Sequence, residues 1–465
     1  MEQLKSYLSQ LPKLNKVLLL SSTDEFGRLA DWLKKTGKAR EICCMPAEAE
    51  HTIGEDVSQS GCGESGRIDA VIFDYGCGKE LSALTTADCT FLIGRMRKAE
   101  DYFRLWESWR TRAKRIYLER DKEIEEKEVT PDRAACEILF WEKGETEIEL
   151  SVIIPVYNVA AYLPECIDSL IRWKAPYVEY LFVNDGSTDT SAEVIADYAK
   201  QDKRIRLINK ENGGCASARN KGIEEAEGSY IGFVDSDDFL EETMFQKLFS
   251  RVIMGNYDLA YCGYSEYNEE TEKSRPVLND CLQEPYVEGT WRQDKVWLLA
   301  IKTRVAIWRC IYRKKMLMRA GIRFHEELKR FDDLPFRVEV LFTAKSAVCV
   351  PEYLYYYRLG RDGQDVACRD DRLFVHFPIF EGLDSFVKSL GDKRLEDLLQ
   401  VVKLHTHGYA LSRIEKKYKK GYIRLARQQL DQNMGYVRTL CLILMYTGKG
   451  NLGWYTRMKV LGLRR

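Results

Sequence analysis

The sequence predicts an α/β protein in which two domains with mostly parallel sheets are followed by a helical C-terminal region. Three observations support this prediction. Strand and helix signals alternate over residues 1–120, the same alternation resumes over residues 149–360, and residues 361–465 show helical patterning without strong strand signals. Alternating strands and helices are typical of parallel sheets that carry helices on their faces. Residues 121–148 lie between the two α/β domains and are predicted to be an acidic linker.

The first domain is predicted to be a small, doubly wound α/β domain. Its strand candidates are KVLLLSS (Lys16–Ser22), REICCMP (Arg40–Pro46), DAVIFDY (Asp69–Tyr75), CTFLIG (Cys89–Gly94) and RIYLER (Arg115–Arg120). Helical stretches such as FGRLADWLKKTG lie between them. The linker then begins with ERDKEIEEKEVTPDR (Glu119–Arg133), a charged segment with few apolar residues. The sequence assigns no task to this domain.

The composition is that of a soluble globular protein. The chain has 465 residues, of which 45% are hydrophobic and 31% are charged. The N-terminal segment MEQLKSYLSQLPKLNK lacks the apolar core of a signal peptide. The longest apolar run, TLCLILMY (Thr439–Tyr446), is far shorter than the roughly 20 residues of a membrane span. The sequence therefore predicts a cytoplasmic protein.

Two common kinds of site are not expected. The fourteen cysteines include no C-x-x-C pair, so reduced structural thiols are expected rather than a disulfide framework or a zinc site. GCGESG (Gly61–Gly66) fits the dinucleotide-binding fingerprint by its letters, but it precedes a strand. The glycines of that fingerprint follow a strand and open a helix, so a plain loop is predicted here.

The second domain opens with a strand that is apolar throughout, LSVIIPVYN (Leu150–Asn158), as expected for a strand buried on both faces. In the following YLPECIDSLIRW, apolar residues recur at helical spacing and predict a helix packed on the sheet. They are Leu163, Cys166, Ile167, Leu170 and Ile171. The strands EYLFV, RIRLIN and SYIGFV follow, with the helix AEVIADYAK between the first two.

Carboxylates gather where two of these strands end. Asp185 follows EYLFV in NDGSTDTS, and Asp235, Asp237 and Asp238 follow SYIGFV in DSDD. Open α/β sheets bind ligands at the carboxyl ends of their strands. Because three neighbouring carboxylates repel one another, a bound cation is expected to balance the DSDD cluster. From the residues alone, an Asx turn at Asp185 and an acidic loop that caps the next helix remain alternatives.

The order of these motifs resembles the family-2 glycosyltransferases with the GT-A fold, a Rossmann-like domain with a mostly parallel sheet. The matching segments are SVIIPVYN, LFVNDGSTDTS, NGGCASARNKGI and GFVDSDDF, and the resemblance covers residues 150–357. It implies an inverting, metal-dependent hexosyltransferase that moves a sugar from a nucleotide sugar, with UDP-sugar favoured, to an acceptor. The acceptor would be a glycan or a lipid-linked molecule of surface polysaccharide or glycoconjugate biosynthesis.

The resemblance also implies roles for single residues. Nucleotide-sugar binding is assigned to Val156, Tyr157, Asp185, Arg219, Asp235 and Ser236. Asp185 would accept a hydrogen bond from the uracil ring N–H, and Arg219 would contact a phosphate, with a surface position on its helix as the alternative. Asp237 would ligate Mn²⁺ or Mg²⁺, and Asp238 would support the other acids by hydrogen bonding.

An inverting transfer also needs a base that deprotonates the acceptor hydroxyl. The family uses an Asp in an ED-like pair downstream of a W…Y-x-R/K segment, and IWRCIYRKKMLMRAGIRFHEELKRFDDLPF fits this pattern. Asp333 is therefore assigned as the base, although Asp332 stands where the family usually has Glu. Helix capping by either Asp, before a Pro in the first turn, is the alternative. YLYYYRLGRDGQDV resembles the segment that closes the site, but the Ser often seen after it is absent, which leaves the role of Arg358 open.

The C-terminal part of the chain is strongly basic. From Leu411 to Arg465, thirteen Lys or Arg residues stand against two acids, while the net charge of the whole chain is −1. This excess predicts peripheral binding to an anionic membrane at the inner face of the cell membrane. The apolar residues expected to face lipid are Trp454, Tyr455, Met458, Val460 and Leu461. A solvated helical face is the alternative, and nucleic acid is not expected without a recognised binding module.

Two other functions compete with glycosyl transfer. A nucleotidyltransferase would carry a Gly-rich loop with Lys or Arg directly after the first strand, and PVYNVAAYL lacks such a loop. A catalytically inactive scaffold that binds partners would not need Asp235, Asp237 and Asp333, which are all present. Release of UDP from a panel of donors would distinguish the three.

Overall fold

The computed structural model describes residues 14–20, 24–37, 39–45, 68–73, 89–96, 115–120, 138–142, 148–255, 257–277, 290–292, 296–328, 330–360, 368–447, 452–453 and 455–456. The chain divides into two compact units. One comprises Met1–Thr146 and Ser250–Asn256, and the other comprises Glu147–Phe249 and Tyr257–Arg465. The glycine-rich segment 61–66, predicted to be a loop, lies outside the described residues.

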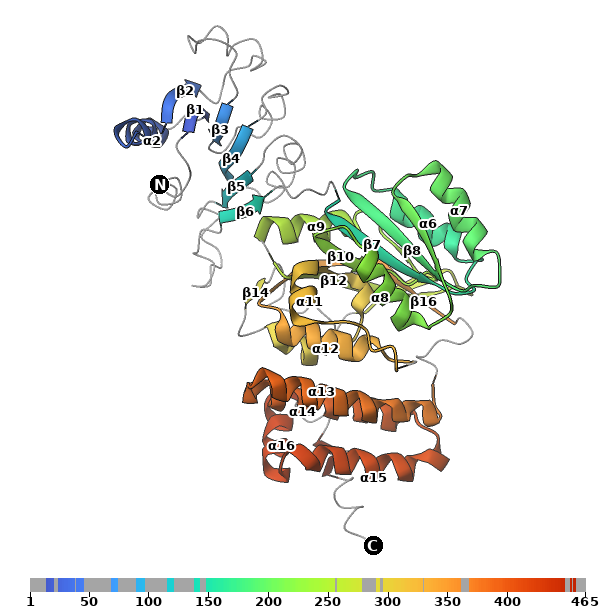
Figure 1. Ribbon diagram of the computed structural model, residues 1–465. Helices are drawn as coiled ribbons and strands as arrows, with labels where there is room; N and C mark the ends of the chain where they lie inside the picture. The colour runs from blue at the N-terminus through green and yellow to red at the C-terminus, as the bar shows by residue number, and fades with distance from the viewer. Residues whose placement is uncertain are drawn as a thin grey trace. The chain divides into compact units, whose positions relative to one another are not determined.

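The first unit is built on a six-stranded sheet with the order β2-β1-β3-β4-β5-β6 (Figure 1). The elements are β1 (Leu14–Leu20), α2 (Asp24–Lys35), β2 (Ala39–Met45), β3 (Ile68–Phe73), β4 (Cys89–Met96), β5 (Arg115–Arg120) and β6 (Ile138–Glu142). The first five strands are parallel and begin within two residues of the predicted positions. This is the doubly wound pattern that the sequence predicts.

The sixth strand corrects the predicted boundary of this domain. β6 pairs antiparallel with β5, with Trp141 opposite Ile116 and Phe140 opposite Tyr117. It lies inside residues 121–148, which are predicted to be a linker. The apolar run ILFW gains strand partners by pairing with β5 and adds the last strand to the sheet, whereas the charged residues before it dominate the composition of the segment.

The second unit contains a ten-stranded mixed sheet with the order β11-β16-β12-β15-β10-β7-β8-β9; β13 pairs with β12 and β14 with β16. The strands are β7 (Leu150–Val156), β8 (Val178–Asp185), β9 (Ile205–Lys210), β10 (Tyr230–Phe233), β11 (Phe239–Leu240), β12 (Leu259–Asn268), β13 (Lys273–Pro276), β14 (Thr290–Arg292), β15 (Cys310–Arg313) and β16 (Ser346–Leu359). The four strands β10, β7, β8 and β9 are parallel, and every residue of β7 is buried, as predicted.

Helices cover both faces of this sheet (Figure 1). They are α6 (Leu163–Ile171), α7 (Ser191–Gln201), α8 (Cys215–Glu225), α9 (Met244–Gly255), α10 (Leu299–Lys302), α11 (Lys314–Ala320) and α12 (Asp333–Thr343). Of α9, the residues up to Phe249 belong to the second unit. α8 packs closely on β7 because Gly222 has no side chain. A Cβ at Gly222 would lie 2.3 Å from Cγ2 of Ile153, so only glycine allows this distance between helix and strand.

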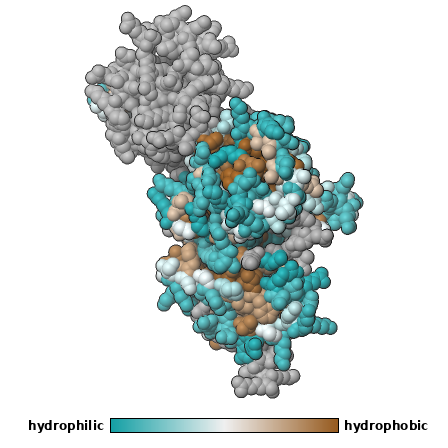
Figure 2. Space-filling view, turned by 45° about the vertical axis from the view of Figure 1, so that its right-hand side comes forward, coloured by the Kyte–Doolittle hydropathy of each residue, from teal (hydrophilic) through white to brown (hydrophobic). Residues whose placement is uncertain are grey.

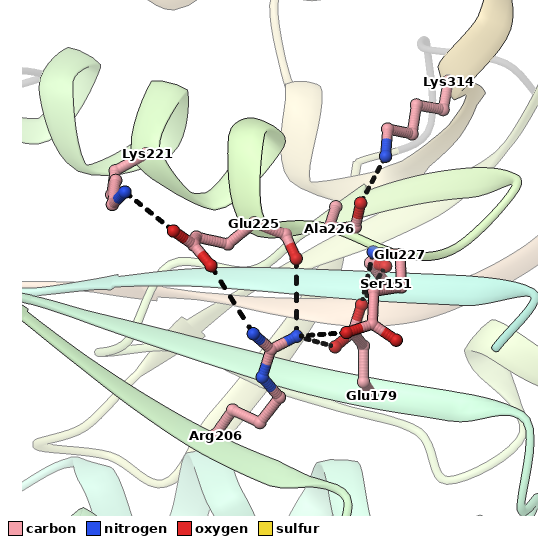
Figure 3. A network of polar contacts seen from close by, with 8 residues as sticks. All are labelled: Ser151, Glu179, Arg206, Lys221, Glu225, Ala226, Glu227 and Lys314. Atoms are coloured by element: carbon pink, nitrogen blue, oxygen red, sulfur yellow. Dashed lines mark hydrogen bonds and ion pairs between the residues drawn. The ribbon is translucent and has the colours of Figure 1, made fainter. Parts of the chain in front are cut away.

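A polar network fixes the C-terminal end of α8 to the amino ends of the parallel strands (Figure 3). Its members are Ser151, Glu179, Arg206, Lys221, Glu225, Ala226, Glu227 and Lys314. The buried Glu179 is its centre: it accepts hydrogen bonds from Ser151 Oγ at 2.6 Å and from the backbone N–H of Glu227 at 2.8 Å, and it pairs with Arg206 at 2.6 Å. The network therefore fixes α8 at the amino ends of the strands. Asp185 and DSDD lie at the opposite, carboxyl ends.

The chain then forms helices, as predicted for residues 361–465. They are α13 (His376–Leu390), α14 (Lys393–Arg413), α15 (Lys416–Asn433) and α16 (Tyr436–Leu442), followed by the π-helical turn Ile443–Thr447. None of the helices among the described residues has both the length and the apolar character needed to cross a bilayer.

Tyr455 corrects one detail of the prediction for the basic C-terminal part. Its side chain is buried in the core of the helical region, where it belongs to the same cluster as Leu404, Tyr422 and Ile443. It does not face outward toward lipid. The other four apolar residues named for that role lie outside the described residues.

A buried chain of hydrogen bonds joins three of these helices. Tyr422 Oη lies 3.2 Å from His376 Nδ1 and 3.0 Å from His407 Nδ1. His407 Nε2 lies 3.1 Å from Gln429 Oε1, and Gln429 Nε2 donates to the carbonyl of Phe377 at 2.9 Å. Since Gln429 uses its N–H₂ group on Phe377, its oxygen accepts from His407, and Tyr422 then donates to His407 and accepts from His376. Both imidazoles are neutral in this arrangement.

Candidate active site

The site lies where β7, β8 and β10 end. Val156 closes β7 and is buried, whereas the next residue, Tyr157, is 50% exposed. Asp185 closes β8, and the DSDD segment follows β10. Because the three strands are adjacent and parallel, these residues meet at one edge of the sheet. The structure thus brings together the residues predicted to bind a nucleotide.

Asp185 is held by the loop that follows β9. Its buried carboxylate accepts hydrogen bonds from Lys210 Nζ at 2.6 Å, Gly213 N at 2.9 Å and Gly214 N at 2.7 Å. The turn after β8 is stabilised by the neighbouring Asn184, whose Oδ1 accepts from Ser187 N at 3.1 Å. A carboxylate offers about four lone-pair positions, so Asp185 keeps one for a further donor.

Asp238 ties the DSDD segment to β16 by hydrogen bonds. It is buried and accepts hydrogen bonds from Tyr355 Oη at 2.7 Å and from Arg358 N at 2.8 Å. Burial raises the pKa of Asp238 well above its ordinary value, and the charges of Asp237 and Asp235 raise it further. Ser236 is buried, while Asp235 and Asp237 are half-buried. The segment thus concentrates negative charge at its two more accessible acids.

Arg358, whose role the sequence leaves open, anchors the same segment. Its Nε donates to the carbonyl of Asp237 at 2.8 Å, and its guanidinium pairs with Glu165 at 2.5 Å and Glu269 at 3.3 Å. Three aromatic rings surround the guanidinium at 5.1–5.5 Å, those of Tyr162, Phe239 and Tyr267. Arg358 therefore fixes the backbone of the DSDD segment between β16 and α6.

Arg219 joins the two halves of the site. It is 6% exposed, so the alternative of a surface arginine on α8 is wrong. Its Nη2 donates to Asp235 at 2.8 Å and its Nη1 donates to Asp332 at 2.9 Å, while the guanidinium lies 5.2 Å from the ring of Phe324. Both terminal nitrogens bond carboxylates of this chain. Arg219 thereby acts in this structure as a positioning residue that ties the DSDD segment to the start of α12.

Asp333 and Asp332 differ in surroundings although they are neighbours. Asp332 stands at the N-cap position of α12, but its side chain caps no backbone N–H and instead binds Arg219. Asp333 has its pKa raised to about 7, by burial first and by the charge of Asp332 second, while Arg219 lowers it. A carboxyl group with this pKa is suited to accept a proton near neutral pH.

The backbone before this pair is strained. Phe331 has a φ of 55°, a left-handed conformation that is rare for a bulky residue. Such strain persists where the surrounding structure imposes it, often at functional sites. Phe331 contacts the ring of His376 at 5.0 Å, and the two residues after it supply the carboxylates.

Tyr357 is a site residue that the sequence analysis does not single out. Its ring lies parallel to that of Trp308 at 5.5 Å, and its hydroxyl has no hydrogen-bond partner among the described residues. Burial raises its pKa, and so do the charges of Asp238, Asp235, Asp237 and Asp333. The charges of the DSDD acids and of Asp333 therefore both act on Tyr357. The alternation of side chains along a strand is the signal that could have found it, because Tyr355, two residues before, bonds Asp238.

The carboxylates fit a divalent metal that a ligand completes. Among the described residues, no group of three His, Cys, Asp or Glu side chains is arranged to hold a metal. Mg²⁺, however, is usually held by one or two carboxylates together with waters and substrate phosphates. The half-buried Asp235 and Asp237 provide such oxygens. Burial is the first cause of the raised pKa of Asp238, and the charges of Asp237 and Asp235, which a cation would offset, are the second.

Comparisons with known proteins indicate the family of this chain. The family model "Glycosyl transferase family 2" matches residues 151–320. The chain is 37% identical over 214 residues to the uncharacterized glycosyltransferase EpsJ of Bacillus subtilis; the match covers 45% of this chain and 60% of EpsJ. It is 30% identical over 214 residues to glycosyltransferase GlyG of Streptococcus pneumoniae, with 45% of this chain and 70% of GlyG covered.

A solved structure shares the fold. The crystal structure of TarS 1-349 of S. aureus in complex with UDP-GlcNAc superposes with a TM-score of 0.51 at 19% identity, covering 66% of this chain and 92% of that one. This likeness confirms the predicted Rossmann-like GT-A architecture. The family match, the identity to GlyG and the fold together identify the chain: it belongs to glycosyl transferase family 2.

Proposed function

We propose that this glycosyltransferase inverts the configuration of a hexose that it moves from a UDP-sugar to an acceptor hydroxyl, with the help of a divalent metal. One observation carries the proposal: Arg219 holds Asp235 and Asp332 in one site, next to Asp333. Carboxylates suited to a metal and donor sugar thus stand close to a carboxylate suited to take the acceptor proton. An inverting displacement needs these two groups together.

The donor side is supported by Asp185 and the edge of β7. The remaining lone pair of Asp185 can accept the ring N–H of uracil, and the exposed Tyr157 offers a ring face beside it. TarS, which has the same fold, was solved with UDP-GlcNAc. Asp235 and Ser236 would contact the ribose or the sugar. Because Arg219 spends its terminal nitrogens on Asp235 and Asp332, it would act on the phosphates only through them.

The metal would be held by Asp237, and Mn²⁺ and Mg²⁺ both suit its oxygen ligands. When bound, it would supply positive charge to the departing nucleoside diphosphate. Arg358 contributes by fixing the backbone carbonyl of Asp237, and Asp238 contributes through its bonds to Tyr355 and Arg358 N. The chain itself therefore pre-positions the acids around the cation.

The acceptor side is formed by Asp333 and Tyr357. Asp333 would take the proton of the attacking hydroxyl, and its pKa of about 7 suits this role. We take the acceptor to be a glycan or a lipid-linked molecule used in polysaccharide biosynthesis. The positive charge of residues 411–465 supports a place on the inner face of the cell membrane, close to such an acceptor.

The test is donor turnover followed by product analysis. The full chain is incubated with a panel of UDP-, GDP- and other nucleotide sugars, with and without Mn²⁺, and release of the nucleoside diphosphate is measured. Metal-dependent release of UDP, with a glycosylated product in mass spectrometry, supports the proposal. Release of pyrophosphate from a nucleoside triphosphate and sugar phosphate would instead identify a nucleotidyltransferase. Donor binding without turnover would favour an inactive scaffold.

A further inference from the structure

Helix α16 and the π-helical turn after it expose an apolar stripe. α16 and the π-helical turn after it bury one side, with Thr439, Leu442 and Ile443 at 0–2% exposure. The opposite side carries Val437 at 72%, Leu444 at 63% and Met445 at 65% exposure, and Tyr446 follows at 42%. The spacing Val437, Cys441, Leu444, Met445 is that of one helix face, and Cys441 is also exposed. We call Val437, Cys441, Leu444 and Met445 the α16 stripe.

This stripe differs from the rest of the described surface. Figure 2 shows one face of the molecule, on which hydrophilic residues predominate and hydrophobic areas also occur. The other large apolar side chains that are exposed among the described residues are scattered singly along the chain: Tyr157, Val305, Met318, Leu390 and Tyr409. Single exposed apolar residues are normal, whereas a contiguous apolar face marks a binding surface.

The helix before the stripe is basic on its outer face. Lys416, Lys420 and Arg424 recur at intervals of four residues on α15 and are exposed, while Tyr422 and Ala426 face the core. In Figure 1, α13 lies next to α12, and α15 runs along the other side of the helical region. The cations of α15 therefore point into solvent.

We infer that the α16 stripe and the basic face of α15 dock this protein onto an anionic phospholipid bilayer, with the stripe entering the headgroup region. The inference deepens the proposed membrane location and rests on it, but it assigns the contact to described helices rather than to the last residues of the chain. Interfacial helices combine an apolar face with lysine and arginine on the polar side. Here α16 and the turn after it supply the apolar residues, and the preceding helix α15 supplies the cations. Each such cation near an anionic surface strengthens the attraction.

A second copy of the chain fits this surface less well. A two-fold interface would place the same surface of both copies together, and the cations of two α15 helices would then repel one another. Standard protein interfaces also bury roughly 800 Å² per partner, which four side chains of one helix do not supply. Anionic lipid, in contrast, attracts the cations and adapts its shape to a convex helix.

The test is co-sedimentation of the full chain with vesicles of phosphatidylcholine mixed with phosphatidylglycerol at low salt. The unchanged chain should bind these vesicles, and vesicles of phosphatidylcholine alone should bind it weakly. Leu444→Glu/Met445→Glu should lower the partition coefficient by about tenfold or more, because it places charge in the apolar face. Lys416→Gln/Lys420→Gln/Arg424→Gln should lower it by a similar factor and only on anionic vesicles.

Met318→Glu is the matched control, because Met318 is a similarly exposed apolar residue on α11; it should bind like the unchanged chain. Melting temperature and UDP affinity, measured without vesicles, should stay unchanged in all variants. If the unchanged chain did not bind UDP, the proposed function would be contradicted, and the inferred lipid contact would not be affected. The inference is overturned if Leu444→Glu/Met445→Glu sediments with anionic vesicles as much as the unchanged chain does. It is also overturned if only truncation after Thr447 abolishes vesicle binding, or if the double substitution leaves vesicle binding intact and only turns a dimer into a monomer.

Discussion

Two adjacent carboxylates at the start of α12 have different surroundings. Asp332 is locked by Arg219, whereas Asp333 has no such partner and its pKa is raised to about 7. Local sequence does not distinguish them, because both stand in FDDLPF and both can cap a helix. The difference comes from Arg219, which lies 113 residues from Asp332 in the chain.

Asp333→Asn should therefore lower transfer by roughly 10²–10⁴-fold, since the base is lost while the shape is kept. Because the pKa of Asp333 is higher in the folded chain than in the unfolded chain, its ionisation lowers the free energy of unfolding. This loss begins above the ordinary pKa of an aspartate and grows until the pH reaches about 7. Asp333→Asn should thus melt at the same or a higher temperature at pH 8. Turnover with saturating acceptor and thermal melting check both points.

Asp332→Asn is the matched control and should show the reverse pattern. It leaves the buried Arg219 with one charged partner, which costs on the order of 1–3 kcal/mol of stability, while transfer should fall far less. If Asp333→Asn kept near-normal turnover, the base would have to be another residue.

The pH dependence of transfer should report the same carboxyl group. Asp333 accepts a proton only when ionised, so with a pKa of about 7 the value of kcat/KM should rise about tenfold per pH unit below 7 and level off above it. This rise of kcat/KM with pH should be absent from the residual activity of Asp333→Asn. A wild-type profile that is flat from pH 5 to 8 would contradict the assignment.

Variants of Asp237 and Asp185 should separate metal binding from recognition of the uracil ring. Chelation by EDTA should abolish transfer, and Asp237→Ala should not recover with excess Mn²⁺, whereas Glu242→Ala, an exposed acid of the next loop, should keep the metal dependence. UDP should bind more tightly than GDP, and Asp185→Ala should weaken UDP binding. Calorimetry and activity titrations measure both effects. Full activity in EDTA, or a preference for GDP, would speak against these roles.

At the scale of elements, most strands are predictable and the exceptions have physical causes. β7 to β10 and the first five strands have apolar runs that local pattern reveals. β16 does not: its sequence SAVCVPEYLYYYRL contains Pro351, which argues against a long strand. The register against β12 shifts between Cys262 and Gly263, so the residues around Pro351 fall at an irregularity where no ladder hydrogen bond is needed.

The packing of α8 on β7 leads to a prediction at this scale. Gly222→Ala would bring a methyl group to 2.3 Å from Ile153, and overpacking of this kind typically costs about 1–3 kcal/mol. Since α8 carries Arg219 one turn earlier, UDP release should also fall. Gly382→Ala is the control, because Gly382 lies within α13 with no atom near its Cβ position. It should stabilise the protein by roughly 0.5–1 kcal/mol. Equal shifts of both variants in urea unfolding would disprove the close-packing argument.

At the scale of the whole molecule, the ten-stranded sheet and the helical region belong to one compact unit, and one of their contacts lies beside the site. Phe331, directly before the Asp332–Asp333 pair, contacts His376 at the start of α13. His376 in turn belongs to the buried chain of hydrogen bonds that joins α13, α14 and α15. The motifs of the catalytic domain do not encode this connection, because its members are separated by up to about a hundred residues.

The stability of this unit should therefore depend on pH through two buried histidines. Burial lowers the pKa of His376 to about 4 and that of His407 to about 3, from ordinary values near 6.5. Below pH 6.5 these histidines bind protons in the unfolded chain but stay neutral in the folded chain. The stability that depends on them is therefore fully present above pH 6.5 and is lost as the pH falls toward 4. At pH 5 each histidine accounts for a loss on the order of 2 kcal/mol.

His407→Gln removes one of these groups, so its free energy of unfolding should fall less steeply between pH 6.5 and 4 than that of the unchanged chain. It should be the less stable protein at pH 8, because it breaks the hydrogen bonds to Tyr422 and Gln429. The two curves should therefore converge on acidification. Urea unfolding at several pH values measures them, and carboxylates titrate alike in both proteins, so they cancel from the difference. Parallel curves would mean that His407 is not the group that couples proton uptake to the loss of the helical core.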